Sequence, residues 1–257
     1  MSNKHIEETS LSKMGWCFDN SYQELPLTMY SFLGPQKVCD PKMVILNEQL
    51  GSEIGLSFKN ISEEVLASFF SGNLVMKSTK YIAQAYAGHQ FGYFTILGDG
   101  RALLVGEHLT KNNRRYDVQL KGSGKTPYSR SGDGRAAISP VLREYLVSES
   151  MHCLGVPTTR SLAAVSTGEK VFRDRPLSGA VLTRVASSHI RIGTFQYAAI
   201  QKDLKSVSLL LDYTVKRHFP EIISEKNVAL SFLKLVMKKQ INLVVNWMRV
   251  GFVHGVM

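Results

Sequence analysis

The feature that most constrains the fold is the order of the hydrophobic patterns, because strand patterns come first and helical patterns come last. Between residues 91 and 186, short apolar runs are separated by glycine-rich turns, which is typical of strands. Residues 204–218 and 229–248 instead carry apolar residues at helical spacing, with lysines and arginines on the other face, and Pro220 separates them. This segregated order predicts an α+β architecture with a sheet followed by helices, rather than an alternating parallel sheet.

The middle of the chain predicts two strands and a long loop. Residues 91–109 are an apolar stretch punctuated by glycines, KNNRR favours a turn, and residues 116–121 (YDVQLK) alternate like a short strand. Residues 122–137 (GSGKTPYSRSGDGRAA) contain four glycines, a proline and three serines, which disfavour regular structure and expose backbone N–H groups.

A helix is predicted directly after this loop. Ser139 suits its N-cap and Pro140 its first position, apolar residues recur at helical spacing, and Gly155 ends it. Residues 159–173 (TRSLAAVSTGEKVFR) predict a hairpin that turns at Thr167 and Gly168, and residues 180–186 (AVLTRVA) predict a further strand.

Composition narrows the function classes without selecting one. The chain has 257 residues, 44% of them hydrophobic, and a net charge of +10, which suits an anionic partner such as a nucleic acid, an acidic membrane or a phosphate compound. The longest apolar runs are too short for a membrane span, and the polar amino terminus lacks a signal-peptide pattern, so we expect a cytoplasmic protein. The three cysteines are far apart and are expected to be reduced thiols.

The clearest candidate for chemistry is a phosphate site. Its candidate residues share glycine-rich loops or the end of a strand: Gly98, Gly100, Arg101, Lys121, Asp133 and Gly134. Glycines let backbone N–H groups approach phosphate oxygens, and lysine or arginine supplies compensating charge. The alternative reading of Gly98 to Arg101 is a tight turn between strands, which uses the same residue types.

Lys121 and Glu144 are predicted to form an ion pair between a strand end and the following helix. In protein kinases a pair of this kind holds the lysine against nucleotide phosphates. The alternative is two solvated surface charges, which contribute little to stability.

Arg184 and Arg191 flank small and hydroxylated residues in TRVASSHIRIGTFQ, a composition that can clamp a phosphate, although a basic strand edge is the alternative. We expect both arginines and Arg101 to converge with Lys121 and the loop around Asp133 on one concavity. His89, His189 and His254 lack partners at metal-ligand spacing and favour structural roles, so no metal ligand is assigned.

Four blocks of this sequence resemble the selenoprotein O family, which has the bacterial name YdiU. The blocks are AYAGHQFGYFTILGDGRA, YDVQLKGSGKTPYSRSGDGRAAISPVLREYL, GVPTTRSLAAVSTGE and AVLTRVASSHIRIGTFQ. The resemblance implies a protein-kinase-like fold that transfers AMP from ATP to Ser, Thr or Tyr hydroxyls of proteins, with Mg²⁺ or Mn²⁺, and some members transfer UMP. It also implies that the eight residues Gly98, Gly100, Arg101, Lys121, Asp133, Gly134, Arg184 and Arg191 bind ATP, with Glu144 as the partner of Lys121.

The resemblance further implies a division of the chain and a missing part. Residues 1–80 would be a leader packed on the lobe, residues 81–200 the nucleotide-binding N-lobe, and residues 201–257 the start of a helical C-lobe. In the family, HGVM is followed by NTDN, which carries the catalytic Asp and a metal ligand. Since this sequence stops at the Met of HGVM, the family Asp would lie beyond Met257. The chain would then be truncated and would hold neither a catalytic residue nor a metal site.

Two other functions remain open at this point. A phosphotransferase of the ordinary kinase type would use the same lysine and glutamate, but would transfer the γ-phosphate. A basic nucleic-acid-binding module would need aromatic residues interleaved with Lys and Arg, whereas the basic residues singled out above lie mostly in or beside glycine-rich loops. We therefore expect protein substrates, and neither nucleic acid nor membrane as a partner.

Overall fold

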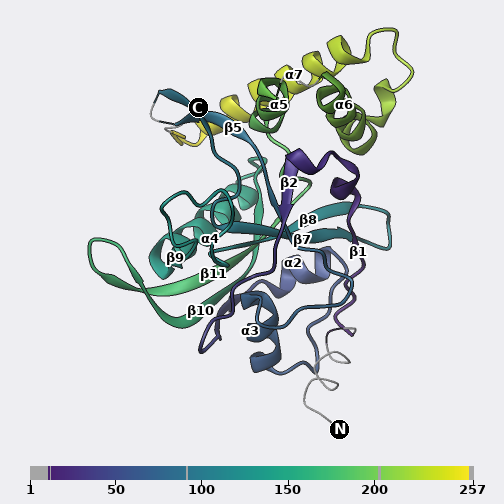
Figure 1. The fold of residues 1–257 in the computed structure, drawn as a ribbon. Coiled ribbons are helices and arrows are strands. Elements are labelled where there is room, and N and C mark those ends of the chain that lie inside the picture. Colours follow the sequence, from purple (N-terminus) through teal and green to yellow (C-terminus); the bar gives the residue numbers. More distant parts are fainter. Residues whose placement is uncertain (1–10, 12, 91, 202–203, 255–257) are drawn as a thin grey trace.

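A large antiparallel sheet organises the chain (Figure 1). The computed structural model describes residues 11, 13–90, 92–201 and 204–254. Nine strands form the sheet, in the order β2-β4-β7-β8-β11-β10-β3, with β1 paired to β7 and β9 paired to β11. Their bounds are β1 Phe18–Asp19, β2 Tyr30–Phe32, β3 Lys42–Leu46, β4 Ile82–Gln84, β7 Ala102–Leu109, β8 Arg115–Lys121, β9 Ala136–Ala137, β10 Arg160–Phe172 and β11 Pro176–Ala186. A separate hairpin pairs β5 (Ala87–Gln90) with β6 (Tyr93–Ile96).

Six α-helices lie among the described residues. They are α2 Glu48–Glu53, α3 Glu63–Ser71, α4 Ile138–Cys153, α5 Ile192–Ile200, α6 Leu204–His218 and α7 Val228–Arg249. Figure 1 shows α5, α6 and α7 together at one end of the molecule, while α2, α3 and α4 lie beside the sheet. The fold is therefore mixed, with strands first and most of the helical residues last, and the predicted segments 204–218 and 229–248 are confirmed as α6 and α7.

Strand β10 is covered on both faces, which explains the unbroken apolar run within it. On β10, Ala163 and Val165 pack into the core that contains α3, whereas Ala164 packs into the core that contains α4. Successive side chains on a strand point to opposite faces, so α3 and α4 cover opposite sides of β10. Both faces must then be apolar, and the segment LAAV reads as an unbroken run.

Two local predictions were wrong. The predicted turn at Thr167 and Gly168 lies inside β10, where Gly168 has a φ of +72° and the β10–β11 register shifts, which marks a bulge; the hairpin turns instead between Phe172 and Pro176. Glycine at a positive φ serves bulges as readily as turns. The N-cap of α4 is Ala137, so Ser139 lies inside the helix and Pro140 is not its first residue.

Buried charges fix α6 against the sheet. Arg217 of α6 donates to Asp117 of β8 at 2.6 Å and to Glu107 of β7 at 3.3 Å, and its side chain is nearly inaccessible to solvent. Glu107 also accepts a hydrogen bond from Arg115 at 2.7 Å. Buried charges are tolerated when they are paired, and this network therefore ties the helical end to the two strands that lead to the candidate site.

The first 80 residues contribute strands to the same sheet. β1 pairs with β7, β2 with β4 and β3 with β10. The partly buried Trp16 stacks on Phe18, with their ring centres 4.9 Å apart, and packs against the core. Cys17, Cys39 and Cys153 are free thiols.

Among the described residues, no helix combines the length and apolar content that crossing a membrane requires.

Candidate nucleotide site

Strand register brings the candidate cations to one face of the sheet. Lys121 lies opposite Leu182, and Arg184 lies opposite Gln119, in the antiparallel pair of β8 and β11. Residues that face one another across such a pair, or lie two apart on one strand, project from the same face. Leu182 belongs to the core that contains α4, so Lys121 and Arg184 project toward that helix.

Glu144 of α4 joins these two cations. Its carboxylate accepts a hydrogen bond from the Lys121 ammonium through one oxygen and from the Arg184 guanidinium through the other. On α4, Val141 and Tyr145 pack into the core, and Glu144, three residues after Val141, lies toward the same side. The structure thus contains the Lys121–Glu144 pair that the sequence predicts, and adds Arg184 as a second partner of Glu144.

The electrostatic setting of this triad lowers the pKa of Lys121 to about 8. Burial is the largest cause, the positive charge of Arg184 contributes next, and Glu144 opposes both. The charge of Arg101 lowers the Lys121 pKa further, which places Arg101 within electrostatic reach of the lysine. Burial would raise the pKa of Glu144, but Arg184 and Lys121 outweigh it, so the carboxylate pKa lies below its ordinary value. One carboxylate thus faces two cations, and a region with surplus positive charge results.

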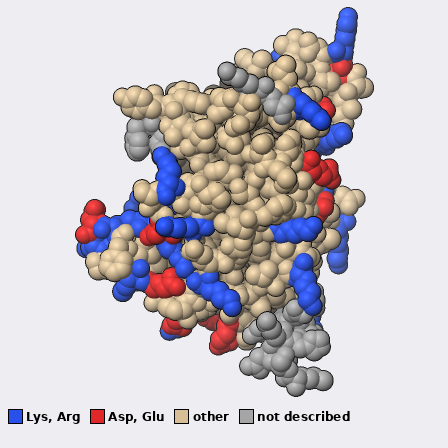
Figure 2. All heavy atoms as spheres, viewed as in Figure 1, with Lys and Arg blue, Asp and Glu red and all other residues tan. Residues whose placement is uncertain are grey.

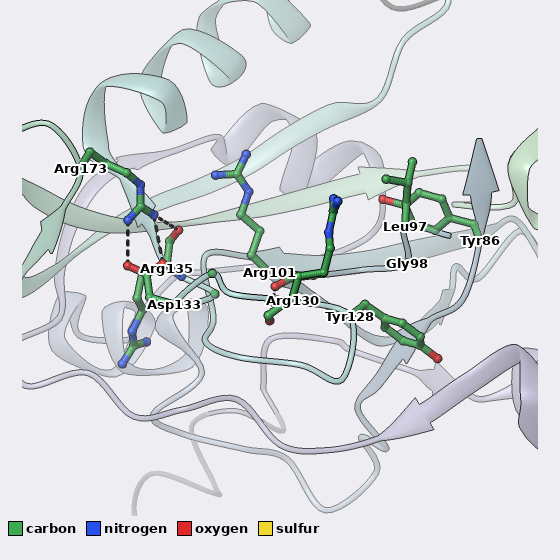
Figure 3. Close-up of a pocket in the computed structure, with 13 residues that line it drawn as sticks. Tyr86, Leu97, Gly98, Arg101, Tyr128, Arg130, Asp133, Arg135 and Arg173 are labelled. Carbon is green, nitrogen blue, oxygen red and sulfur yellow. Dashed lines mark hydrogen bonds and ion pairs between the residues drawn. The ribbon is translucent and has the colours of Figure 1, made fainter. Parts of the chain in front are cut away.

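A pocket of about 470 Å³ contains the other predicted loop residues. Of the predicted set, it is lined by Gly98, Gly100, Arg101, Asp133 and Gly134. Figure 3 shows Arg173 and Asp133 at one end, Tyr86, Leu97 and Tyr128 at the other, and Arg101 and Arg130 between them. Among the described lining residues, four are arginines (Arg101, Arg130, Arg135 and Arg173) and one, Asp133, is acidic.

Two backbone segments that contribute to this pocket, residues 98–100 and 126–129, are in close contact. Thr126 donates to the carbonyl of Asp99 at 2.7 Å, and Ser129 donates to the carbonyl of Gly100. Gly98 has a φ of +73°, and a Cβ there would lie 2.3 Å from the Tyr128 ring. Gly98 therefore has the backbone conformation that the alternative reading, a tight turn, requires, whereas a Cβ on Gly100 would lie 2.8 Å from the carbonyl oxygen of Tyr128. Both glycines line the pocket.

A glycine is required at position 134 because the backbone of Gly124 lies directly against it. Its φ is +70°, and a Cβ would lie 2.1 Å from the carbonyl carbon of Gly124, whose N–H donates to the Gly134 carbonyl at 3.1 Å. Asp133 forms an ion pair with Arg173 at 2.8 Å and accepts from the backbone N–H of Arg135 at 2.9 Å. Its pKa lies below the ordinary value, chiefly because of the Arg173 hydrogen bond.

Arg191 connects the pocket to the sheet. Its guanidinium carbon lies 4.2 Å from the centre of the Tyr86 ring, and its terminal nitrogen lies 3.6 Å from a carboxylate oxygen of the buried Asp99. Asp99 in turn accepts from Gln119 at 3.2 Å, and Gln119 accepts from Arg184 at 3.1 Å. A continuous polar network therefore runs from the Lys121–Glu144–Arg184 triad to the wall of the pocket.

The expected single concavity is only partly observed. Arg101 and the loop around Asp133 share the pocket, whereas Lys121, Arg184 and Arg191 are not among the residues that line it. The sequence analysis missed Arg130, Arg135 and Arg173. The first two lie in the glycine-rich loop that was already singled out, and their charge was the available signal; the position of Arg173 depends on where the hairpin turns.

The histidines fit structural roles better than ligand roles. His189 is buried, and its backbone N–H donates to Asp117 at 2.7 Å; His89 packs against Phe94, and His254 stacks on Trp247. Within the part of the chain that the structure describes, no three His, Cys, Asp or Glu residues are grouped so that they could hold a metal ion.

The family's catalytic Asp is expected beyond Met257, outside the residues that the structure describes. Met257 lies outside the described residues, which end at His254, and the HGVM stretch is described only at its first residue. The absence of a catalytic residue and of metal ligands from this chain therefore stays a prediction of the family resemblance.

Comparison with known proteins gives a consistent set of relatives. The family model described as "Protein adenylyltransferase SelO" matches residues 14–257. Proteins named "Protein nucleotidyltransferase YdiU" from Nitrosococcus oceani and Pelagibacter ubique are 57% and 55% identical to this chain, each over 244 residues. A protein of the same name from Brevibacillus brevis is 56% identical over 243 residues. These matches cover about 95% of this chain, but the chain spans about half the length of these relatives.

Proposed function

Since the chain belongs to the SelO family of protein adenylyltransferases, we propose that it forms the nucleotide-binding half of a protein nucleotidyltransferase. The observation that carries this proposal is the arginine-lined pocket together with Lys121 and Arg184, which share the carboxylate of Glu144. In the pocket, Arg173 is paired with Asp133 and Arg135 with Glu169, whereas Lys121 and Arg184 share one carboxylate, that of Glu144. Cations that outnumber their anionic partners repel one another, and a bound polyphosphate would remove that repulsion. We propose ATP as the nucleotide that this chain binds. UTP is the alternative, because some members of the family are expected to transfer UMP.

In this proposal the residues of this chain bind and orient the phosphates. Arg101 and the glycine turns contact phosphate oxygens from the pocket, and Lys121 and Arg184 supply charge from the sheet. Asp133 and Gly134 belong to the same site because they shape the loop beside Arg101. Glu144 keeps Lys121 in place before the nucleotide arrives, which lowers the cost of ordering a long side chain. Arg191 packs on Tyr86 and holds that wall of the pocket.

The reaction is the transfer of AMP to a protein hydroxyl. The hydroxyl oxygen bonds to the α-phosphorus, the bond from that phosphorus to the pyrophosphate oxygen breaks, and pyrophosphate leaves while a base takes the hydroxyl proton. None of the described residues is assigned as that base, and no step is routed through a metal. We therefore propose that this chain alone binds ATP without transferring AMP. The kinase-like lobes of the family would be complete only with the half of the relatives that this chain does not match.

Isotope placement tests the proposed reaction against the kinase alternative. The test protein is a fusion of this chain to the half of the Nitrosococcus oceani relative that the chain does not match. With a mixture of hydroxyl-bearing proteins, Mg²⁺ and Mn²⁺, we expect label on protein from α-labelled ATP and none from γ-labelled ATP. The chain alone and a Lys121→Ala fusion serve as controls. Label from the γ-position would instead support a phosphotransferase.

Figure 2 bears on the alternative of a nucleic-acid-binding module for one face of the described residues only. On the face that Figure 2 shows, the Lys and Arg side chains are separated by neutral surface and, in places, by Asp and Glu.

A further inference from the structure

Asp133 is the one acidic residue among the described residues that line the arginine-lined pocket. Its pKa lies below the ordinary value, so the carboxylate carries its negative charge at neutral pH. A fixed negative charge at the wall of a pocket repels the phosphates of a nucleotide. A pocket that binds ATP therefore needs a group that offsets the charge of Asp133.

Arg173 contacts both oxygens of this carboxylate. One terminal nitrogen of its guanidinium donates to one Asp133 oxygen at 2.8 Å, and the other terminal nitrogen donates to the second oxygen at 3.0 Å. The same two nitrogens also donate to the backbone carbonyls of Phe172 at 2.6 Å and Arg135 at 3.0 Å. A two-point contact between arginine and carboxylate fixes the orientation of both groups, and the two carbonyls hold the guanidinium in place.

The two partners come from different parts of the sheet. Asp133 lies in the glycine-rich loop before β9, and Arg173 lies in the turn between β10 and β11. Strand β9 already pairs with β11, and a second ion pair joins Arg135 to Glu169 of β10 at 3.2 Å. Figure 3 shows Arg173 at the end of the pocket, directed toward Asp133. The β10–β11 hairpin therefore holds the loop that lines the pocket.

The exposure of this pair indicates an effect on binding rather than on folding. The side chains of Arg173 and Asp133 are 41% and 42% exposed. Ion pairs as exposed as this one contribute little to stability, whereas a charge at the wall of a pocket acts directly on a charged ligand. Arg175 lies in the same turn and is also exposed, but it does not line the pocket, and no ion pair joins it to another described residue.

We infer that Arg173 is a positioning residue of the proposed nucleotide site, which holds Asp133 and its loop in place and offsets the negative charge of that carboxylate. The inference rests on the proposed function, since a pocket for an uncharged ligand would not need this offset. Arg173 acts through Asp133 and is assigned no phosphate contact, because its terminal nitrogens are already engaged. Without Arg173, a nucleotide would face an unpaired carboxylate, and the repulsion would grow with the number of phosphates.

A series of nucleotides with increasing charge tests this inference. Calorimetric titration of the chain with AMP, ADP and ATP, in buffer without divalent metal, measures the three affinities. Arg173→Met should lower the affinity for ATP by about tenfold and that for AMP by about twofold, because Coulomb repulsion increases with ligand charge. Arg175→Met removes the same charge from the same turn and should leave all three affinities unchanged. Equal losses for ATP and AMP, or equal losses in the two variants, would overturn the inference.

Two further variants separate charge from geometry. Arg173→Lys keeps the positive charge without the two-point contact, so the ratio of ATP to AMP affinity should stay within about twofold of the natural value. Adding Asp133→Asn to Arg173→Met removes the unpaired anion and should restore that ratio, although the loop has lost its anchor. A purely structural role would predict no such restoration, and a ratio that stays low in both variants would overturn the inference.

Hydrogen exchange tests the positioning of the loop without any nucleotide. The backbone N–H of Arg135 donates to Asp133 at 2.9 Å. Mass spectrometry of peptides that cover residues 129–137 should show exchange about fivefold or more faster in Arg173→Met, and unchanged in Arg175→Met. Unchanged exchange in Arg173→Met would overturn the inference. If the natural chain bound no nucleotide, the proposed function would fail, and hydrogen exchange would still decide whether Arg173 orders this loop.

Discussion

Lys121, the last residue of β8, is held by the carboxylate of Glu144, 23 positions later on α4. The same carboxylate also accepts from Arg184 of β11, so two strands and one helix meet at a single acidic group. Removing that group would leave two partly buried cations without their common partner, and such a loss costs more than the loss of an exposed pair.

Glu144→Gln is therefore expected to weaken ATP binding by about tenfold or more, because Lys121 and Arg184 lose their orientation and repel each other. Calorimetric titration with ATP measures this change, and circular dichroism verifies that the variant folds. Glu48→Gln removes the same charge from an exposed position at the start of α2 and should have no effect. Unchanged affinity in Glu144→Gln would show that the carboxylate plays no part in nucleotide binding.

The lowered pKa of Lys121, about 8, predicts a pH dependence of ATP binding. The lysine must be protonated to pair with phosphate, so affinity should fall by up to about tenfold between pH 7 and pH 9. The same group also affects folding stability, because the pKa of Lys121 is lower in the folded chain than in the unfolded chain. Below pH 8 the buried positive charge lowers the free energy of unfolding, and this cost disappears as the pH rises toward the unfolded pKa of about 10.4. Titrations with ATP at several pH values and fixed ionic strength should show this fall in affinity for the natural chain and a flatter pH profile for Lys121→Met. Identical pH profiles for the two proteins would assign the pH dependence of ATP binding to another group.

Arg217→Met should destabilise the fold by about 3–5 kcal/mol, because it leaves Asp117 and Glu107 buried with one partner fewer. Burial would raise the pKa of Asp117, but the His189 hydrogen bond and the charge of Arg217 outweigh it and lower the pKa. This stabilisation is present above the unfolded pKa of about 3.9 and is lost as the pH falls through the lower folded value. Urea unfolding measures both effects. Lys216→Met changes the exposed neighbour on α6 and should shift stability by less than about 0.5 kcal/mol, and a similar loss in both variants would refute the role of the network.

Gly134→Ala should distort the loop that lines the pocket. The added Cβ would meet the backbone of Gly124, and the positive φ is unfavourable for alanine, so we expect a loss of about 1–3 kcal/mol in stability together with weaker ATP binding. Gly34→Ala is the control, because a Cβ there would have no atom within 4 Å. Thermal unfolding and ATP titration of the two variants test the contrast, which fails if both behave alike.

Sequence reasoning predicted those parts of the site that depend on local patterns. A strand that ends in Lys121 and a helix that starts soon after it place Glu144 close by, and the loop glycines were recognisable because backbone turns demand them. The shared role of Glu144 was not predictable, since it depends on the register that sets Arg184 opposite Gln119. Arg217 reaches the sheet from a helix 100 positions beyond Asp117, and no periodic pattern reports such a contact.

The wrong predictions about the fold also concern features that depend on contacts between distant parts of the chain. The Thr167–Gly168 turn was wrong because a positive φ serves a bulge as well as a hairpin, and only the paired strand distinguishes the two. Ser139 was wrong as an N-cap because β9 pairs with β11 up to Ala137, where the helix begins. Helix α5 was missed because it is short and weakly amphipathic, and it is positioned by its packing against β5 and α6.

The central claim is that this chain binds ATP through the arginine-lined pocket and the adjacent lysine. Calorimetric titration of the purified 257-residue chain with ATP tests it most directly, with Lys121→Ala and Arg101→Ala as site variants. Lys111→Ala is the matched control, because it lies in the exposed turn at the opposite end of the β7–β8 pair. The account predicts weak but saturable binding that each site variant reduces by about tenfold or more and the control leaves unchanged. Binding that is absent in the natural chain, or that all three variants retain equally, would contradict it.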